Sequence, residues 1–195
     1  MSTETHRTPN PVVRRLYDRL GELLDEGDDP FVEHGPALLR AAIRDPDFFD
    51  GVSTEQASTG TYTRRKVVGD EGEHVIRFME WPPGYALMPH EHHSRPCFEV
   101  LVDGLLTVVN MRPEELDDGL YELTALDTEV VRPGETTVVD PRVGDVHAVY
   151  SPVRSRSLHV YPGDASHAFG YCLVDDAAEN DRYRRLRFDL DCGDD

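Results

Sequence analysis

The sequence predicts a fold dominated by β-strands, a small barrel or sandwich preceded by two helices. Apolar residues recur at three- and four-residue spacing within the first 50 residues, which is the helical period. From Gly51 onward, short runs of alternating apolar and polar residues follow one another almost to the end of the chain. Gly, Pro and Asp separate these runs at intervals of about eight to twelve residues, as in sandwiches and barrels.

The first predicted helix runs from Val12 to Glu26, where the apolar stripe is continuous, and Gly27 ends it. A second, shorter helix is predicted over Pro36 to Arg44. It ends at Asp45 because the residue before a proline is disfavoured in helical conformation. Stripes of this kind usually face a core, so we expect both helices to pack against the rest of the domain.

The rest of the chain predicts a series of short strands. They are expected near residues 61–68, 74–81, 85–92, 97–103, 105–110, 119–124, 128–132, 135–139, 146–152, 155–161, 168–174 and 183–189. A chain of 195 residues suffices for one domain with a sizeable core. We therefore expect a single domain over 1–195, with a helical segment (1–50) packed on a barrel (51–190) and an acidic tail (191–195).

The chain is strongly acidic. Its 38 acidic residues outnumber 20 basic ones, of which only Lys66 is lysine, and the net charge is −18. This excess disfavours binding to nucleic acid or to an anionic membrane surface. Acid enrichment with so little lysine is typical of proteins from a high-salt cytoplasm, where screening relieves self-repulsion. An ordinarily acidic mesophilic protein is the alternative.

The three cysteines, Cys97, Cys172 and Cys192, lack the paired spacing of a disulfide framework, which favours a reducing compartment. No apolar run approaches the roughly 20 residues needed to cross a bilayer, and the N-terminus lacks a basic and apolar signal pattern. We expect a cytoplasmic protein, and a monomer.

Two histidines at i and i+2, His90 and His92, fall within one predicted strand and so share a face, whereas Glu91 and His93 share the other. A third histidine, His147, follows a Pro/Gly turn and enters an apolar strand. Imidazole suits iron, copper, nickel and zinc, and a site with open positions suits small-molecule activation. Taken alone, a histidine such as His147 is more often a hydrogen-bonded core residue than a ligand, but its place behind a Gly turn, after His-x-His, favours metal binding.

Two further polar sets share strand faces. Ser157, His159 and Tyr161 lie at i, i+2 and i+4, so one face displays all three and they can form a hydrogen-bonded chain. Tyr62 and Arg64 also share a face. A guanidinium aimed into an apolar pocket needs a carboxylate partner, which a substrate could supply; a surface ion pair is the alternative.

These residues resemble the two motifs of the cupin superfamily, a small double-stranded β-helix barrel. The first motif is matched by Gly84, His90, His92, Cys97 and Gly104, and the second by Pro141, Gly144 and His147. The second motif carries one extra residue between its proline and glycine, and Ser151 replaces the usual asparagine. Cys97 stands where most metal cupins have a glutamate ligand.

Cysteine in the glutamate place, with three histidines, resembles the thiol dioxygenase family and within it the cysteine dioxygenases. The stretches TYTRRKV and SLHVY resemble that family's Tyr-x-Arg and Ser-x-His-x-Tyr segments, so the resemblance covers roughly Thr61 to Phe169. It implies Fe(II) held by His90, His92 and His147, with L-cysteine and O2 as substrates and cysteine sulfinic acid as product.

The resemblance also implies the remaining roles. Tyr62 and Arg64 would bind the substrate carboxylate, and Tyr161, tuned by His159 and Ser157, would contact the substrate or oxygen. A thioether would join Cys97 to Tyr161, although Cys97 is also compatible with a small buried apolar residue.

Three alternatives stay open. The first is a dioxygenase of another small thiol such as 3-mercaptopropionate; related enzymes with that preference tend to lack both the arginine and the cysteine. The second is a manganese or zinc isomerase or hydrolase, and the third is a non-catalytic sensor or metal-binding cupin. Glu99 shares the face of Cys97 and is expected either to pair with an arginine or to lie near the metal. His93 and His167 are expected outside the ligand set, and Arg65 in solvent.

Overall fold

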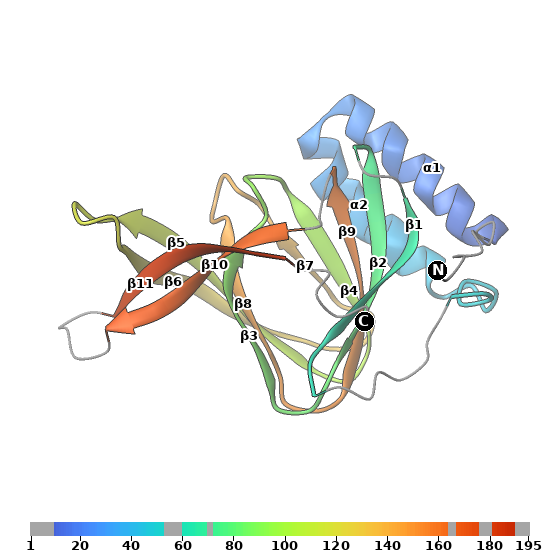
Figure 1. Ribbon diagram of the computed structural model, residues 1–195. Coiled ribbons are helices and arrows are strands. Elements are labelled where there is room, and N and C mark those ends of the chain that lie inside the picture. Colours follow the sequence, from blue (N-terminus) through green and yellow to red (C-terminus); the bar gives the residue numbers. More distant parts are fainter. Residues whose placement is uncertain (1–9, 53–59, 70–71, 164–166, 176–180, 190–195) are drawn as a thin grey trace, which may run out of the picture.

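The computed structural model describes residues 10–52, 60–69, 72–163, 167–175 and 181–189 (Figure 1). The predicted acidic tail, 191–195, lies outside them. The elements are α1 (Pro11–Glu26), α2 (Asp28–Ala42), β1 (Thr63–Gly69), β2 (His74–Trp81), β3 (Tyr85–Glu91), β4 (Cys97–Asp103), β5 (Leu106–Glu115), β6 (Tyr121–Val131), β7 (Thr136–Val139), β8 (Val146–Ser151), β9 (Ser155–Pro162), β10 (His167–Asp175) and β11 (Arg182–Asp189).

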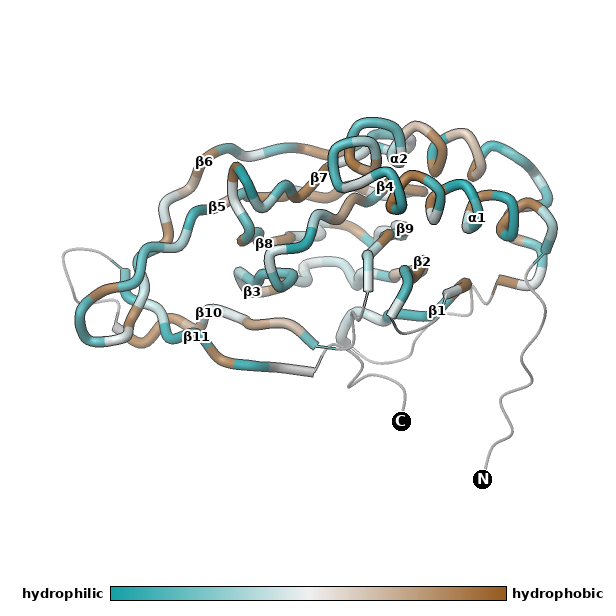
Figure 2. Tube along the Cα trace, turned by 90° about the horizontal axis from the view of Figure 1, so that it is seen from above, coloured by the Kyte–Doolittle hydropathy of each residue, from teal (hydrophilic) through white to brown (hydrophobic). Residues whose placement is uncertain are grey.

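The strands form two antiparallel sheets. One has the order β1-β2-β9-β4-β7, and the other has the order β10-β11-β6-β5-β8-β3 and closes on itself because β3 also pairs with β10. Seen from above, β6, β5, β8, β3 and β10 follow one another across the molecule in that order (Figure 2). The prediction of a β-dominated fold with N-terminal helices is confirmed.

The first helix follows the prediction closely. Asn10 caps α1 by accepting a hydrogen bond from the Val13 N–H at 2.9 Å, and Gly27, with φ of +123°, ends the helix. The second helix differs from the prediction, because α2 already begins at Asp28 rather than at Pro36.

The early start of α2 has a physical reason. Asp28 and Asp29 place negative charge at the positive end of the helix dipole. Pro36 lies inside the helix and removes only one backbone donor. Complete burial of Phe31 and Leu39, at 0% exposure, favours helix on both sides of the proline.

The strand prediction was wrong in one place. The stretches 119–124 and 128–132 form one strand, β6, which pairs with β5 along its whole length. Ala125 and Asp127, predicted to lie in a turn, are opposite Met111 and Asn110, and Leu126 between them is an extra residue that forms a bulge in β6. The other strands lie within a few residues of the predicted ranges.

The helices cover one face of the five-stranded sheet (Figure 1). The buried residues joining them are Val12, Val13, Leu16, Leu20, Leu23, Phe31 and Leu39 from the helices and Ile76, Phe78, Phe98, Val100, Leu158 and Val160 from β2, β4 and β9. Because strand side chains alternate, the residues between these strand positions point away from the helices toward the other sheet. That second face carries the polar residues described next.

Candidate metal centre

Three buried histidines converge between the two sheets. His90 is the last residue but one of β3, His92 is the first residue after that strand, and His147 lies on β8 opposite His90 in register. One ligand nitrogen from each lies within 4.8 Å of the others. The Nε2 atoms of His90 and His147 are 3.1 Å apart. Two nitrogens bound to one ion at about 2.1 Å and at right angles would be about 3.0 Å apart, so these residues fit a shared metal ion.

The contacts of the histidine rings orient them for this role. Nδ1 of His90 lies 3.0 Å from the Met88 carbonyl oxygen, which can only accept, so Nδ1 carries the proton and Nε2 keeps a lone pair. Nδ1 of His92 lies 3.6 Å from Sγ of Cys97. Burial lowers the pKa of His90 to about 4 and those of His92 and His147 well below their ordinary value. The rings are therefore neutral at physiological pH, as metal ligands must be.

The two segments that supply the ligands are tied together beyond the strand pairing. Directly after His92 the chain turns through two residues with positive φ, His93 at 58° and Ser94 at 55°. The Ser94 N–H donates to Oδ2 of Asp145 at 2.9 Å, two residues before His147. This bond fixes the turn after His92 against the turn before His147.

One motif glycine is required by its neighbours. Gly104 has φ of +90°, and a Cβ there would lie 2.3 Å from Oγ of Ser155. Any side chain would both strain the backbone and displace β9 from β4.

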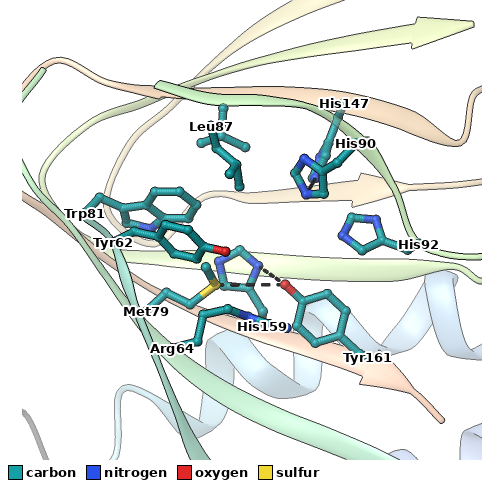
Figure 3. Close-up of a pocket in the computed structure, with 11 residues that line it drawn as sticks. Tyr62, Arg64, Met79, Trp81, Leu87, His90, His92, His147, His159 and Tyr161 are labelled. Carbon is teal, nitrogen blue, oxygen red and sulfur yellow. Dashed lines mark hydrogen bonds between the residues drawn. The ribbon is translucent and has the colours of Figure 1, made fainter. Parts of the chain in front are cut away.

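The histidines face a small pocket whose opposite wall comes from the five-stranded sheet (Figure 3). The pocket is lined by Tyr62, Arg64, Met79, Trp81, Leu87, His90, His92, His147, Val149, His159 and Tyr161. Arg64 is only 4% exposed, and its Cζ lies 5.3 Å from the centre of the Tyr161 ring. Tyr62 stacks on Trp81 with 5.4 Å between ring centres. Tyr62 and Arg64 thus line the same pocket, and their role in binding a substrate carboxylate stays a prediction.

A hydrogen-bonded chain crosses the sheet wall beneath the pocket. Oγ of Ser157 lies 2.8 Å from Nε2 of His159, and the Tyr161 hydroxyl lies 3.1 Å from Nδ1 of the same ring. Trp81 donates its indole N–H to Oγ of Ser157 at 2.8 Å. Burial raises the pKa of Tyr161 well above its usual range, and the nearby Arg64 guanidinium lowers this pKa by a smaller amount. The phenol is therefore protonated and held in place.

Cys97 lies next to this chain. It is 4% exposed, it belongs to a small cluster with Val75, Val139 and Tyr161, and burial raises the pKa of its thiol well above the ordinary value. The structure thus brings Cys97 and Tyr161 into one cluster, and the thioether between them stays a prediction.

Several side chains take positions that the sequence did not specify. Glu99, at 3% exposure, lies with Oε2 2.8 Å from Nε2 of His159 and is not part of the histidine cluster. Arg65, expected in solvent, pairs with the buried Glu80 at 3.2 Å. His93 and His167 contact each other, with ring centres 4.6 Å apart, outside the cluster as expected.

Sequence reasoning missed Met79 and Trp81 as pocket residues. They share a face of β2, and Met79 lies opposite Ser157 in register. Strand parity alone would have placed both on one face. That this face lines the pocket follows only from the pairing of β2 with β9, two strands that lie far apart in the sequence.

Comparison with protein-family models gave no match, and comparison with curated proteins gave none either. Similar solved structures include a cupin superfamily protein from Desulfitobacterium hafniense, at 12% identity and TM-score 0.42 over 56% of this chain and 84% of that one. A cupin from Shewanella frigidimarina is 17% identical with TM-score 0.44 over 60% and 89%. The polyketide cyclase RemF from Streptomyces resistomycificus is 22% identical with TM-score 0.43 over 64% and 80%. At these identities and TM-scores, function is inferred from the chain's own residues alone.

Among the described residues, no helix combines the length and apolar character required for crossing a bilayer.

Proposed function

We propose that this protein is a non-haem Fe(II) thiol dioxygenase that oxidises L-cysteine with O2 to cysteine sulfinic acid. The proposal rests on one observation: two walls of different chemistry face each other across the pocket. One wall carries three buried, neutral imidazoles, and the other carries a buried guanidinium beside a phenol. A metal site built from imidazoles alone suits iron, and the missing carboxylate ligand leaves positions for substrate and oxygen.

His90, His92 and His147 would hold the iron. When bound, it would favour the thiolate form of the substrate and bring sulfur and O2 together, so that both oxygen atoms are transferred to the sulfur. The rings provide neutral nitrogen donors at physiological pH, because burial keeps their pKa values low.

The sheet wall would orient the substrate. Arg64 is buried and would bind the substrate carboxylate through charge-assisted hydrogen bonds, which a small pocket strengthens by excluding water. The Tyr161 hydroxyl, held by His159 at 3.1 Å, would contact the substrate between the guanidinium and the histidines. Tyr62, stacked on Trp81, would support the carboxylate end.

The activity can be tested with purified protein loaded anaerobically with Fe(II), in high-salt buffer. Oxygen uptake on addition of L-cysteine, together with a product that carries two additional oxygen atoms by mass spectrometry, is the expected result. 3-Mercaptopropionate, which lacks the amine, and cysteamine, which lacks the carboxylate, serve as matched substrates. We expect L-cysteine to have the highest kcat/KM of the three.

The other outcomes are equally informative. A higher kcat/KM for 3-mercaptopropionate would keep the dioxygenase chemistry and change the substrate. Tight iron binding without oxygen uptake for any of the three thiols would refute the proposal and favour a non-catalytic metal-binding role.

A further inference from the structure

A buried carboxylate lies behind the Ser157–His159–Tyr161 chain. Glu99 on β4 is directly opposite His159 on β9 in register, is 3% exposed, and brings Oε2 to 2.8 Å from Nε2 of the ring. The same nitrogen lies 2.8 Å from Oγ of Ser157, with which it forms a hydrogen bond. Neither Glu99 oxygen meets the geometric criteria for a hydrogen bond with any of the described residues. A buried carboxylate is expensive without a donor, and Nε2 of His159 lies within reach.

The position of this carboxylate bears on the proton of the ring. A neutral imidazole carries one proton, on either Nδ1 or Nε2. Ser157 could donate its hydroxyl proton to Nε2, which would leave the ring proton on Nδ1 and direct it toward Tyr161. With Glu99 at 2.8 Å, however, a lone pair on Nε2 would face a negative charge. A proton on Nε2 removes that repulsion and satisfies the carboxylate.

We propose that Glu99 is a positioning residue that fixes His159 as the Nε2–H tautomer, so that Tyr161 donates its hydroxyl proton to Nδ1 of the ring. The oxygen lone pairs of Tyr161 then remain available to accept from a pocket ligand. Ser157 accepts a hydrogen bond from Trp81, and in this arrangement it does not determine the tautomer of His159. The arrangement follows the logic of a carboxylate that orients a histidine toward a hydroxyl group.

Neighbouring charges are compatible with this assignment. Arg77 on β2 lies opposite His159 in register, so a guanidinium and a carboxylate flank the same ring from the two adjacent strands. Any catalytic consequence rests on the proposed function, whereas the tautomer does not.

The tautomer can be read directly from two-bond ¹H–¹⁵N correlations of the imidazoles in uniformly ¹⁵N-labelled, metal-free protein at neutral pH. The chain contains its own standards. Nε2 of His74 faces the Tyr17 carbonyl at 3.0 Å and must carry the proton, and Nδ1 of His90 faces the Met88 carbonyl and must carry it there. His159 should give the pattern of His74.

Two variants and a control separate the contributions. Glu99→Leu, which keeps an apolar filling, should convert His159 to the pattern of His90, with Ser157 now donating to Nε2. Ser157→Ala should leave the pattern unchanged, because Glu99 still accepts. Glu80→Gln, which alters a different buried carboxylate on β2, should also leave it unchanged. An Nδ1–H pattern in the parent protein, or a switch in Ser157→Ala, would overturn the assignment.

Should Glu99→Leu fail to fold, the parent spectrum and Ser157→Ala still decide the question. In the iron-loaded enzyme, Glu99→Leu should lower kcat for cysteine roughly tenfold with little change in KM, as expected for a residue that acts through another. A parent with the Nε2–H pattern but no cysteine oxidation would refute the proposed function and leave the tautomer standing. Cysteine oxidation by a parent protein with the Nδ1–H pattern would support the proposed function and refute the tautomer assignment.

Discussion

The two walls of the pocket are polar in different ways. The histidine wall, formed by His90, His92 and His147, contains neutral rings whose pKa values are lowered by burial. The sheet wall, formed by the inward face of β1, β2, β4 and β9, carries the buried guanidinium of Arg64 and, outside the pocket lining, the buried carboxyl group of Glu99. A neutral wall of lone pairs suits a cation, and a wall with a buried guanidinium suits an anion. A ligand that is anionic at one end and metal-binding at the other matches both.

The walls also differ in their support. The sheet wall is backed by α1 and α2, which pack on its reverse face with fully buried side chains such as Leu20 and Phe31. The histidine wall depends on strand pairing between β3 and β8 and on the Ser94–Asp145 hydrogen bond. Loss of a histidine should therefore change metal binding with modest effects on the helical core.

The largest effect is expected on the histidine wall. His147→Ala should reduce metal affinity by more than the roughly 10–100-fold that follows loss of an outer contact, because a ligand itself is lost. Metal content after dialysis, measured by mass spectrometry of the ion, checks this. His34→Ala, on the exposed side of α2, is the matched control and should retain full metal content. Retention of metal by His147→Ala would remove His147 from the site.

A smaller effect on substrate binding is expected from the sheet wall. Arg64→Gln should lower kcat/KM for cysteine roughly 30- to 160-fold, mostly through KM, because charge-assisted hydrogen bonds contribute about 2–3 kcal/mol. Iron content should stay near full, which distinguishes the two walls.

Arg65→Gln is the matched control for Arg64→Gln. Arg65 is the next residue of β1, but its side chain pairs with Glu80 instead of lining the pocket. Its replacement should leave KM for cysteine unchanged. Equal KM values for Arg64→Gln and the parent would remove Arg64 from carboxylate binding.

The sheet wall also shows how far sequence alone could reach. Strand alternation correctly placed Ser157, His159 and Tyr161 on one face, with Leu158 and Val160 in the helix-facing core. This worked because β9 is regular and its two faces have different chemistry. The role of Glu99 was left open because its partner is set by the pairing of β4 with β9, which joins residues about 60 positions apart.

The errors in secondary structure have the same origin. The start of α2 at Asp28 and the continuity of β6 through Ala125 and Asp127 both depend on contacts outside the local sequence. Burial of Phe31 favours the longer helix, and pairing with β5 favours the longer strand. The histidines were found because two sequence motifs carry them, which needed no knowledge of strand pairing.

The smallest expected effect is on the free energy of unfolding and not on function. In metal-free protein the pKa of His90 is lowered to about 4 from an ordinary 6.5, so the unfolded chain takes up a proton at a pH where the folded protein does not. The contribution of this group to stability is present above pH 6.5 and is lost as the pH falls toward 4. Between pH 7 and pH 5 it should amount to about 2 kcal/mol.

His90→Gln removes this titration. Urea unfolding of both metal-free proteins should therefore show the parent losing about 2 kcal/mol more than His90→Gln between pH 7 and pH 5. Between pH 7 and pH 8 the two proteins should change nearly in parallel, because the unfolded-state ring is mostly neutral there and the group contributes only about 0.1 kcal/mol. Parallel curves at acidic pH as well would mean that His90 is hydrated in the metal-free protein. The histidine wall would then lack the dry, neutral character that distinguishes it from the sheet wall.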